Sequence, residues 1–403
     1  MHRFQAFLFT VEKSADLRTA LPPFLGSGMP LLENLDFTAP RPSAAADCSD
    51  VDVHLTSEWF PCLRTLALSR TAIPRDIPLY ARLRMLTLRG CYPKLSFDDF
   101  LDALAASVQL EGLALFDTLV HLNPGREWMH GGRPIPRRPP ILLPRLRDFL
   151  LQEPGVIHTS RFLAHLHLPP SAHLSIAANI EEPSPDTTIS LSAMLPPDPS
   201  TTIPSLAIAT HVTMVITECC EVRYKHPNPA AIPAKSPRDY STLTLDLDRH
   251  QWRPYMAQGL DDLVHFFAGS PLTFLMVWGD HTYGTAAAWG KVFRTFPLLE
   301  GLEIGGYNEV AVVFRGLHAA SSRPHADSTV ACQNLKNVVL RGMGEMETYD
   351  AMRECFRWRG DRGVVLKVID CVLRMPQCRT CAVRLSRICM GQWSTFDKPG
   401  RRL

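Results

Sequence analysis

The cysteines near the C-terminus are the best metal-ligand candidates in the sequence. Cys371, Cys378, Cys381 and Cys389 follow one another in a short segment, and Cys378 and Cys381 form its single C-x-x-C pair. A structural zinc site usually takes its thiolates from two such pairs, because each pair comes from one tight turn. Cys371 also falls at an apolar position of a strand pattern, where a small buried side chain is expected. Zinc is therefore a weak possibility, and we expect no cofactor.

Two histidine-containing stretches could also support chemistry. His165 and His167 alternate in AHLHL, which places both on one face of a strand, where such a pair can chelate a metal. No Asp, Glu or Cys aligns with them, so we expect surface residues. In WGDHTYG, Asp280, His281 and Tyr283 follow a strand, but no nucleophile accompanies them. The residue types therefore disfavour acid–base catalysis at this loop.

The chain carries none of the common catalytic or nucleotide-binding motifs. It has no G-x-x-x-x-G-K-[ST], no G-x-G-x-x-G after a strand, no H-E-x-x-H and no G-x-S-x-G. Its 42 basic and 40 acidic residues leave a net charge of +2, which favours neither nucleic acid nor an anionic membrane as a partner. We therefore expect a non-enzymatic protein that binds neither. Its 11 cysteines, an odd number, favour an intracellular compartment, cytoplasmic or nuclear.

The secondary-structure elements that would position any site come from a repeated sequence motif, which we call the repeated phrase. FPCLRTLALSR (60–70) has near copies in MPLLENLDF, YARLRMLTLRG, FPLLEGLEIGG and CQNLKNVVLRG. Each copy reads apolar-x-x-apolar-x-apolar, and its second half has the period of two that is typical of a short strand. The clearest triplets are Leu32, Leu35 and Phe37; Leu63, Leu66 and Leu68; Leu83, Leu86 and Leu88; Leu110, Leu113 and Leu115; Leu146, Phe149 and Leu151; Leu272, Leu275 and Val277; Leu299, Leu302 and Ile304; and Leu335, Val338 and Leu340.

Amphipathic helices fill several intervals between the copies. Phe97, Phe100, Leu101 and Leu104 have helical spacing, with Ser96 placed as the N-cap, and LDDLVHFFAGS and AAAWGKVFRTFP repeat that spacing. A strand with one helix cannot bury its apolar face alone, so neighbouring units must stack. The sequence predicts an α/β fold: a leucine-rich-repeat solenoid shaped as a right-handed horseshoe. We expect a parallel sheet on its concave face, and helices and irregular loops on its convex face.

The repeat pattern runs over residues 1–375, which we expect to form one leucine-rich-repeat domain. Pro-rich stretches near 123–140, 181–205 and 226–239 predict irregular insertions. The strand pattern continues around the last two, so we expect the sheet to persist there with extended connections in place of helices. Residues 376–403, rich in Cys and Arg, lack the pattern and are predicted to form a disordered tail.

The same pattern predicts a binding surface. Residues between the apolar positions of each strand face away from the core, and repeat proteins bind partners through such extended surfaces. We therefore expect an unidentified protein target to contact these residues: Arg64, Thr65, Arg84, Thr87, Glu111, Thr273, Met276, Glu300, Glu303 and Lys336.

Several phrases are similar to a known family. LLEGLEIGG, VFRGLHAASS, CQNLKNVVLRGM and TYDAMRECFRWRGDRG, with FPCLRTLALSRTAIP, resemble the leucine-rich-repeat region of the F-box-like proteins of mushroom-forming fungi. That resemblance implies the substrate-recognition half of a ubiquitin-ligase adaptor whose F-box docks on the Skp/cullin scaffold. No F-box pattern precedes the first repeat strand, so the scaffold is implied only if an F-box lies upstream. The alternative is a leucine-rich-repeat scaffold or truncated gene product without a ubiquitin-ligase role.

Overall fold

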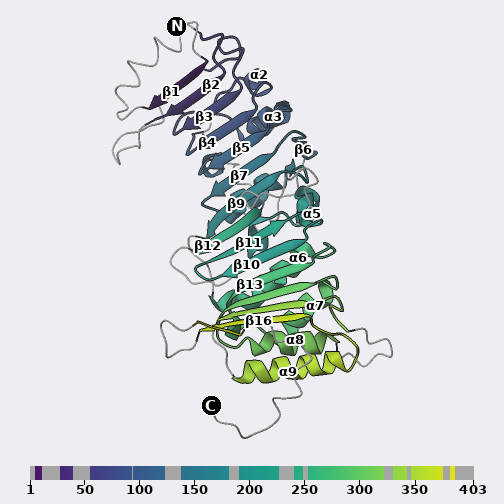
Figure 1. Ribbon diagram of the computed structural model, residues 1–403. Helices are drawn as coiled ribbons and strands as arrows, with labels where there is room; N and C mark the ends of the chain where they lie inside the picture. The colour runs from purple at the N-terminus through teal and green to yellow at the C-terminus, as the bar shows by residue number, and fades with distance from the viewer. Residues whose placement is uncertain are drawn as a thin grey trace. The chain divides into compact units, whose positions relative to one another are not determined.

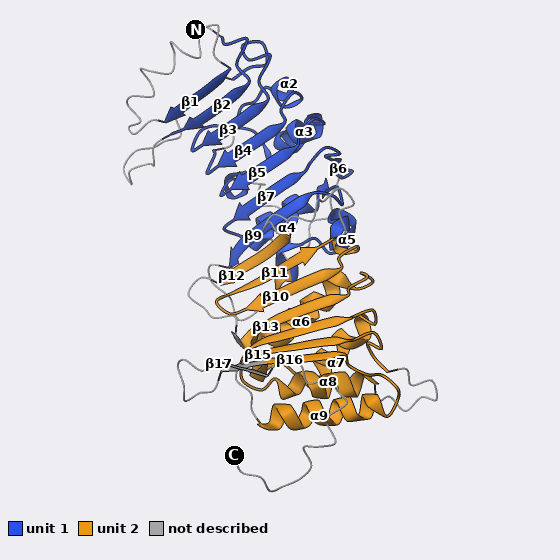
Figure 2. Cartoon of the chain, in the orientation of Figure 1, with its two compact units in different colours: residues 1–182, 192–205 blue, residues 183–191, 206–403 orange. Residues whose placement is uncertain are grey.

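The computed structural model divides into two compact units, where the sequence pattern predicted one domain. Unit 1 comprises residues 1–182 and 192–205, and unit 2 comprises residues 183–191 and 206–403 (Figure 2). Both are α/β, with mostly parallel strands. The structure describes residues 5–10, 28–39, 55–92, 94–122, 138–180, 190–226, 240–247, 253–321, 330–342, 346–374 and 382–385.

Unit 1 contains a parallel sheet whose strands are hydrogen-bonded in chain order (Figure 1). Its register pairs Leu66 with Leu86 and Leu86 with Leu113, so equal positions of the repeated phrase form continuous apolar rows. The strands are β1 (Ala6–Thr10), β2 (Asn34–Thr38), β3 (Thr65–Ser69), β4 (Met85–Arg89), β5 (Gly112–Phe116), β7 (Asp148–Glu153) and β9 (His173–Ile180), with β6 (Ile141–Leu142) and β8 (Leu166–His167) forming a separate parallel pair.

The predicted helix after β4 is confirmed. The Ser96 hydroxyl accepts a hydrogen bond from the Asp99 N–H at 3.1 Å, and the Asp99 carboxylate accepts one from the Ser96 N–H at 3.1 Å, which completes a capping box. Phe100 stacks on Phe162 of the next helix, with ring centroids 6.2 Å apart. The helices of unit 1 are α2 (Ile77–Tyr80), α3 (Phe97–Ala106), η2 (Leu119–His121), α4 (Val156–Leu163) and α5 (Pro199–Thr202).

The sheet of unit 2 combines parallel strands with antiparallel pairing at two places. Strands β10, β13, β14, β15 and β16 are parallel, whereas β11 runs antiparallel to both β10 and β12, and β17 runs antiparallel to β16. Their order is β12 (Ser241–Leu247), β11 (Cys219–Lys225), β10 (His211–Ile216), β13 (Phe274–Asp280), β14 (Gly301–Tyr307), β15 (Asn337–Gly342), β16 (Val368–Arg374) and β17 (Ala382–Leu385).

The expectation of a wholly parallel sheet is therefore wrong at β10–β12. Only Thr217 and Glu218 separate β10 from β11, and two residues suffice for a hairpin. A parallel pair needs a crossover of about a dozen residues or more. The chain must therefore reverse direction at this point.

Helices cover one face of the unit 2 sheet. Tyr224 of β11 packs edge-on against Phe267 of α6, with ring centroids 5.6 Å apart. Helices α7 and α8 approach closely at two glycines, because a Cβ added to Gly316 would lie 2.5 Å from the Trp289 Cβ and 3.1 Å from the Gly290 nitrogen. The helices are η7 (Arg253–Tyr255), α6 (Met256–Phe267), η8 (His281–Tyr283), α7 (Ala286–Thr295), α8 (Ala311–Ser321) and α9 (Met346–Gly360).

The predicted apolar triplets form the core of both units. Their side chains are between 0% and 5% exposed, which confirms the predicted inward positions of each strand. Complete burial of a Leu or Phe side chain contributes about 1.5–3 kcal/mol to folding. The apolar positions of the repeated sequence pattern therefore form the core.

Three glycines align where β13, β14 and β15 end. Gly279 pairs with Gly306, and Gly306 pairs with Gly342. A Cβ on Gly306 would lie only 1.8 Å from the Gly279 carbonyl oxygen, and its φ of +133° disfavours any side chain. At this end the backbones of the three strands therefore lie against each other with no side chain between them.

The predicted irregular stretches are only partly described. Residues 123–137, 181–189 and 227–239 lie outside the described residues. After the second gap, the chain forms three short helices, η4 (Leu191–Met194), α5 and η5 (Pro204–Leu206), in which Leu191 and Met194 are fully buried. The expectation of only extended connections is therefore wrong here, because turns of three or four residues are too short to show helical periodicity.

Two further features concern the C-terminal segment and the character of the described helices. Ala382–Leu385, in the segment predicted to be a disordered tail, form β17, and the rest of residues 376–403 lies outside the described residues. Among the described helices, none combines the length and apolar character needed to cross a bilayer.

Candidate functional site on the open face of unit 2

The C-terminal cysteines form no described metal site. Cys371 lies on β16 at an inward position, 6% exposed, and burial raises the pKa of its thiol to about 11. Cys378, Cys381 and Cys389 lie outside the described residues. Within the described part of the chain, no three His, Cys, Asp or Glu side chains are grouped so that they could hold a metal ion.

The prediction that His165 and His167 are surface residues on one strand face is wrong for His165. His167 lies on β8, is exposed and has its Nδ1 2.8 Å from the Thr201 carbonyl oxygen. His165 lies in the turn after α4, is 6% exposed and packs edge-on against Phe97 at 5.7 Å. The turn, rather than a strand, fixes its direction. Burial lowers the pKa of His165, which keeps this ring neutral in the core.

The Asp280–His281 stretch is structural. His281 is fully buried, and its Nε2 donates a hydrogen bond of 3.1 Å to the Gly305 carbonyl oxygen. Burial lowers the pKa of His281 to about 4. The Asp280 carboxylate accepts the Thr282 N–H at 3.2 Å and thereby caps η8. These bonds tie the loop to β14, and the imidazole has no exposed surface at which a substrate could bind.

The predicted partner-binding residues of unit 1 align across its sheet. Arg64, Arg84 and Glu111 each precede a strand, and backbone bonds of 2.7 Å join Arg84 N to Arg64 O and Glu111 N to Arg84 O. The Arg84 and Glu111 side chains form a 3.8 Å ion pair. Thr65 and Thr87 are partly exposed on β3 and β4. This set forms a polar surface.

The predicted residues of unit 2 gather around β13 and β14. Thr273, Glu300 and Lys336 precede successive strands, joined by backbone bonds of 2.8 Å from Glu300 N to Thr273 O and from Lys336 N to Glu300 O. On the strands themselves, Met276 pairs in register with Glu303. The ten predicted residues therefore form two sets, one in each unit.

The most distinctive feature of this surface is an apolar row, of which the sequence analysis predicted only Met276. Phe274, Met276 and Trp278 project from β13 on the face opposite Leu275 and Val277, and all three are partly exposed. We call this row the β13 stripe. We call the sheet face that carries it the open face of unit 2. Its signal in the sequence is the unbroken apolar run FLMVW, which makes both faces of this strand apolar.

Glycines on β14 determine how the two aromatic rings lie. Phe274 pairs in register with Gly301, and Trp278 pairs with Gly305. A Cβ on Gly301 would be 2.7 Å from Phe274 Cδ2, and one on Gly305 would be 2.0 Å from Trp278 Cε3. The rings therefore occupy the space that β14 side chains would fill, and lie across the neighbouring strand.

Ion pairs flank the β13 stripe on both sides. On β11, Arg223 pairs with Glu221, with 2.8 Å between Nε and Oε1. Beyond β14, Arg341 of β15 donates a hydrogen bond to the Glu303 carboxylate. Lys225 adds a further cation near the Phe274 end, across from His211. The charges of these two ion pairs therefore compensate each other, and the apolar row is the dominant feature beside Met276.

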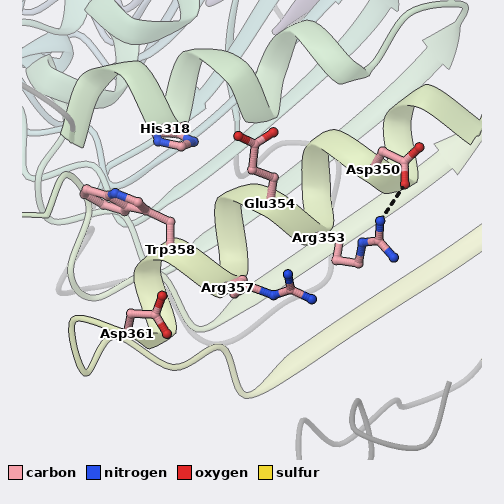
Figure 3. Close-up of a pocket in the computed structure, with 7 residues that line it drawn as sticks. All are labelled: His318, Asp350, Arg353, Glu354, Arg357, Trp358 and Asp361. Carbon is pink, nitrogen blue, oxygen red and sulfur yellow. Dashed lines mark hydrogen bonds and ion pairs between the residues drawn. The ribbon is translucent and has the colours of Figure 1, made fainter. Parts of the chain in front are cut away.

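Unit 2 also carries a groove between α8 and α9. It measures about 440 Å³ and is lined by exposed charged side chains (Figure 3). The Trp358 ring lies tilted against His318, with ring centroids 5.2 Å apart, and the Arg362 guanidinium lies over it at 3.7 Å. Arg353 pairs with Asp350 at 3.1 Å. The Trp358 ring, Arg353 and Asp350 thus already have partners, as in the polar outer surface of a terminal repeat.

Comparisons with protein families and with curated proteins were both negative. No family model matches the chain, and a search of curated proteins found no match either.

Proposed function

We propose that this protein is a non-enzymatic intracellular module that recognises another protein through the open face of its sheet. Support comes from the mostly parallel strands, the apolar rows in register and the helices packed against one face. These features are those of a leucine-rich-repeat solenoid, and we propose the right-handed horseshoe form, with the sheet on the concave face.

The observation that carries this proposal is the β13 stripe. A folded protein usually buries a row of Phe, Met and Trp, and partly exposed apolar patches of this kind mark interaction surfaces. Aromatic residues and Met are also enriched where proteins bind each other. A protein target therefore fits the surface better than a small molecule, because the rings lie on an open sheet face and not in an enclosed pocket.

The sequence resemblance supports a specific biological context. We propose that the module acts as the substrate-recognition half of an F-box-type ubiquitin-ligase adaptor, with the Skp/cullin scaffold as a second partner only if an F-box precedes these residues. Recovery of a Skp subunit with the product of the native transcript tests this context. Recovery of the target without Skp would favour the alternative, a repeat scaffold with no ubiquitin-ligase role.

The binding face itself is tested by affinity capture and quantitative mass spectrometry. The test protein carries alanine at Arg64, Arg84 and Glu303, which lie on the sheet surfaces of the two units. The control carries alanine at Asp261 and Lys291, an exposed pair on α6 and α7 that is held at 2.6 Å. We expect the first protein to lose a partner that the wild type and the control retain, with unchanged circular dichroism for all three. Equal recovery by all three would contradict the proposal.

A further inference from the structure

We propose that the β13 stripe binds an apolar, uncharged peptide segment of another protein. This inference rests on the proposed function and adds the chemistry of the partner. Phe274, Met276 and Trp278 are alternate residues of one strand, so their side chains lie about 6–7 Å apart in a line. A line of this kind suits an extended segment that places successive apolar side chains along it.

The aromatic rings are held in a fixed orientation. Because Gly301 and Gly305 lack side chains, Phe274 and Trp278 each pack one side of the ring over β14, and the other side points away from the sheet. His211 further restrains Phe274, with ring centroids 5.7 Å apart. A rigid apolar surface loses little conformational entropy when a partner binds.

The surrounding charges favour an uncharged segment. Glu221 is already neutralised by Arg223, and Glu303 by Arg341, and the Glu303 side chain is only 13% exposed. A partner carboxylate or ammonium placed at Met276 would lose water without gaining an unpaired counter-charge. Near Trp278, the Asp280 carboxylate is 9% exposed and already accepts the Thr282 N–H. Lys225 lies across from His211, which pairs with Phe274, and it takes part in no described ion pair.

The experiment is selection of a random 12-residue peptide library, displayed on phage, against the wild-type chain. We expect the enriched peptides to be rich in Leu, Ile, Phe, Met or Trp and poor in charged residues. For the best peptide, made synthetically, we expect its Kd to change by less than about threefold between about 0.1 M and about 1 M NaCl, where the Debye length falls from about 10 Å to about 3 Å.

Two variants and a matched control locate the binding site. Met276→Lys places a charge at the centre of the stripe without leaving a cavity, and Trp278→Ala removes one ring. Each substitution should raise the Kd of the peptide by about 30-fold or more, as expected for a central anchor residue. Met346→Lys makes the same substitution at a Met that is 76% exposed on α9, and it should bind as the wild type does.

Each result decides one point. If the enriched peptides are charged and Met276→Lys still weakens their binding, the proposed chemistry is wrong. The sheet face would then remain the binding surface. Apolar peptides that bind all three variants like the wild type, or a library without any enriched sequence, would overturn the β13 stripe as the site. Loss of the captured protein in the alanine test above then remains the separate measure of the proposed function.

Discussion

The carboxylate of Glu153 accepts the backbone N–H of Leu119, with both of its oxygens 3.1 Å from that nitrogen. It also accepts the Thr118 N–H at 3.0 Å, so a side chain at the end of β7 caps η2. Glu153 is 1% exposed. Burial raises its pKa to about 7, although the N–H donors act in the opposite direction.

This pKa predicts that acid stabilises unit 1 locally. Because the folded-state pKa of about 7 lies above the ordinary value of 4.5, the folded state holds the proton more tightly. Its contribution is fully present below pH 4.5 and is lost as the pH rises through 7. Urea unfolding should show the wild type losing roughly 2–3 kcal/mol over this range relative to Glu153→Gln, which carries no titrating group. Parallel pH profiles for the two proteins would contradict this assignment.

Neighbouring aspartates on α6 should differ sharply in their effect on stability. Asp262 is 2% exposed and accepts the Ser190 hydroxyl at 2.5 Å and the Leu191 N–H at 2.8 Å. Asp262→Ala removes the acceptor of both hydrogen bonds from a buried site, so it should cost about 3 kcal/mol. Asp261→Ala, which removes only an exposed ion pair, should cost about 1 kcal/mol or less. Denaturant midpoints compare the two, and equal losses would refute the distinction.

Helix α9 contains a second matched pair, Arg359 and Arg357. The Arg359 guanidinium is 1% exposed and donates to the carbonyl oxygens of Ala331, at 2.6 Å, and Cys332, at 2.8 Å. Arg359→Ala leaves both oxygens without these donors and should cost about 2–4 kcal/mol. Arg357→Ala, at an exposed position of the same helix, should change stability by about 0.5 kcal/mol or less. Thermal unfolding that ranks the variants in the opposite order would disprove this role.

The aligned glycines predict a position at which even alanine is not tolerated. Gly306→Ala would place a Cβ 1.8 Å from the Gly279 carbonyl oxygen, so β13 and β14 would have to separate. We expect a loss of about 3 kcal/mol or more, or failure to fold. Gly360→Ala, where nothing lies within 4 Å, should be neutral or stabilising by up to about 1 kcal/mol. Hydrogen exchange at β13 and β14 would locate the damage, and protection like that of the wild type would contradict it.

The sequence was most informative where one residue pattern has one structural solution. Leu63, Leu66 and Leu68 are buried as predicted, and α3 begins at its Ser96 cap, because burial and capping depend on local spacing. The direction of β11 was not visible in the same way, since alternation is identical in parallel and antiparallel strands. The two-residue connection between β10 and β11 is the sequence feature that indicates the reversal.

The candidate site was less predictable than the fold. Met276 and Glu303 were placed on the outward face correctly, because strand alternation alone decides that. The aromatic part of the stripe was missed because Trp278 and Gly305 are far apart in sequence, and only the register of β13 with β14 reveals that the ring lies over a glycine. His165 was misplaced for a related reason, since a turn and not a strand carries it.

The reversed strand β11 limits how this chain can change length over evolution. Where β13 to β16 run parallel, duplication or loss of one strand with its helix leaves every other strand pointing the same way. In the β10–β11–β12 segment, loss of a single strand would leave the next one facing backwards. Related genes that differ in repeat number should therefore gain or lose β11 only together with an adjoining strand, whereas the parallel units can come and go singly.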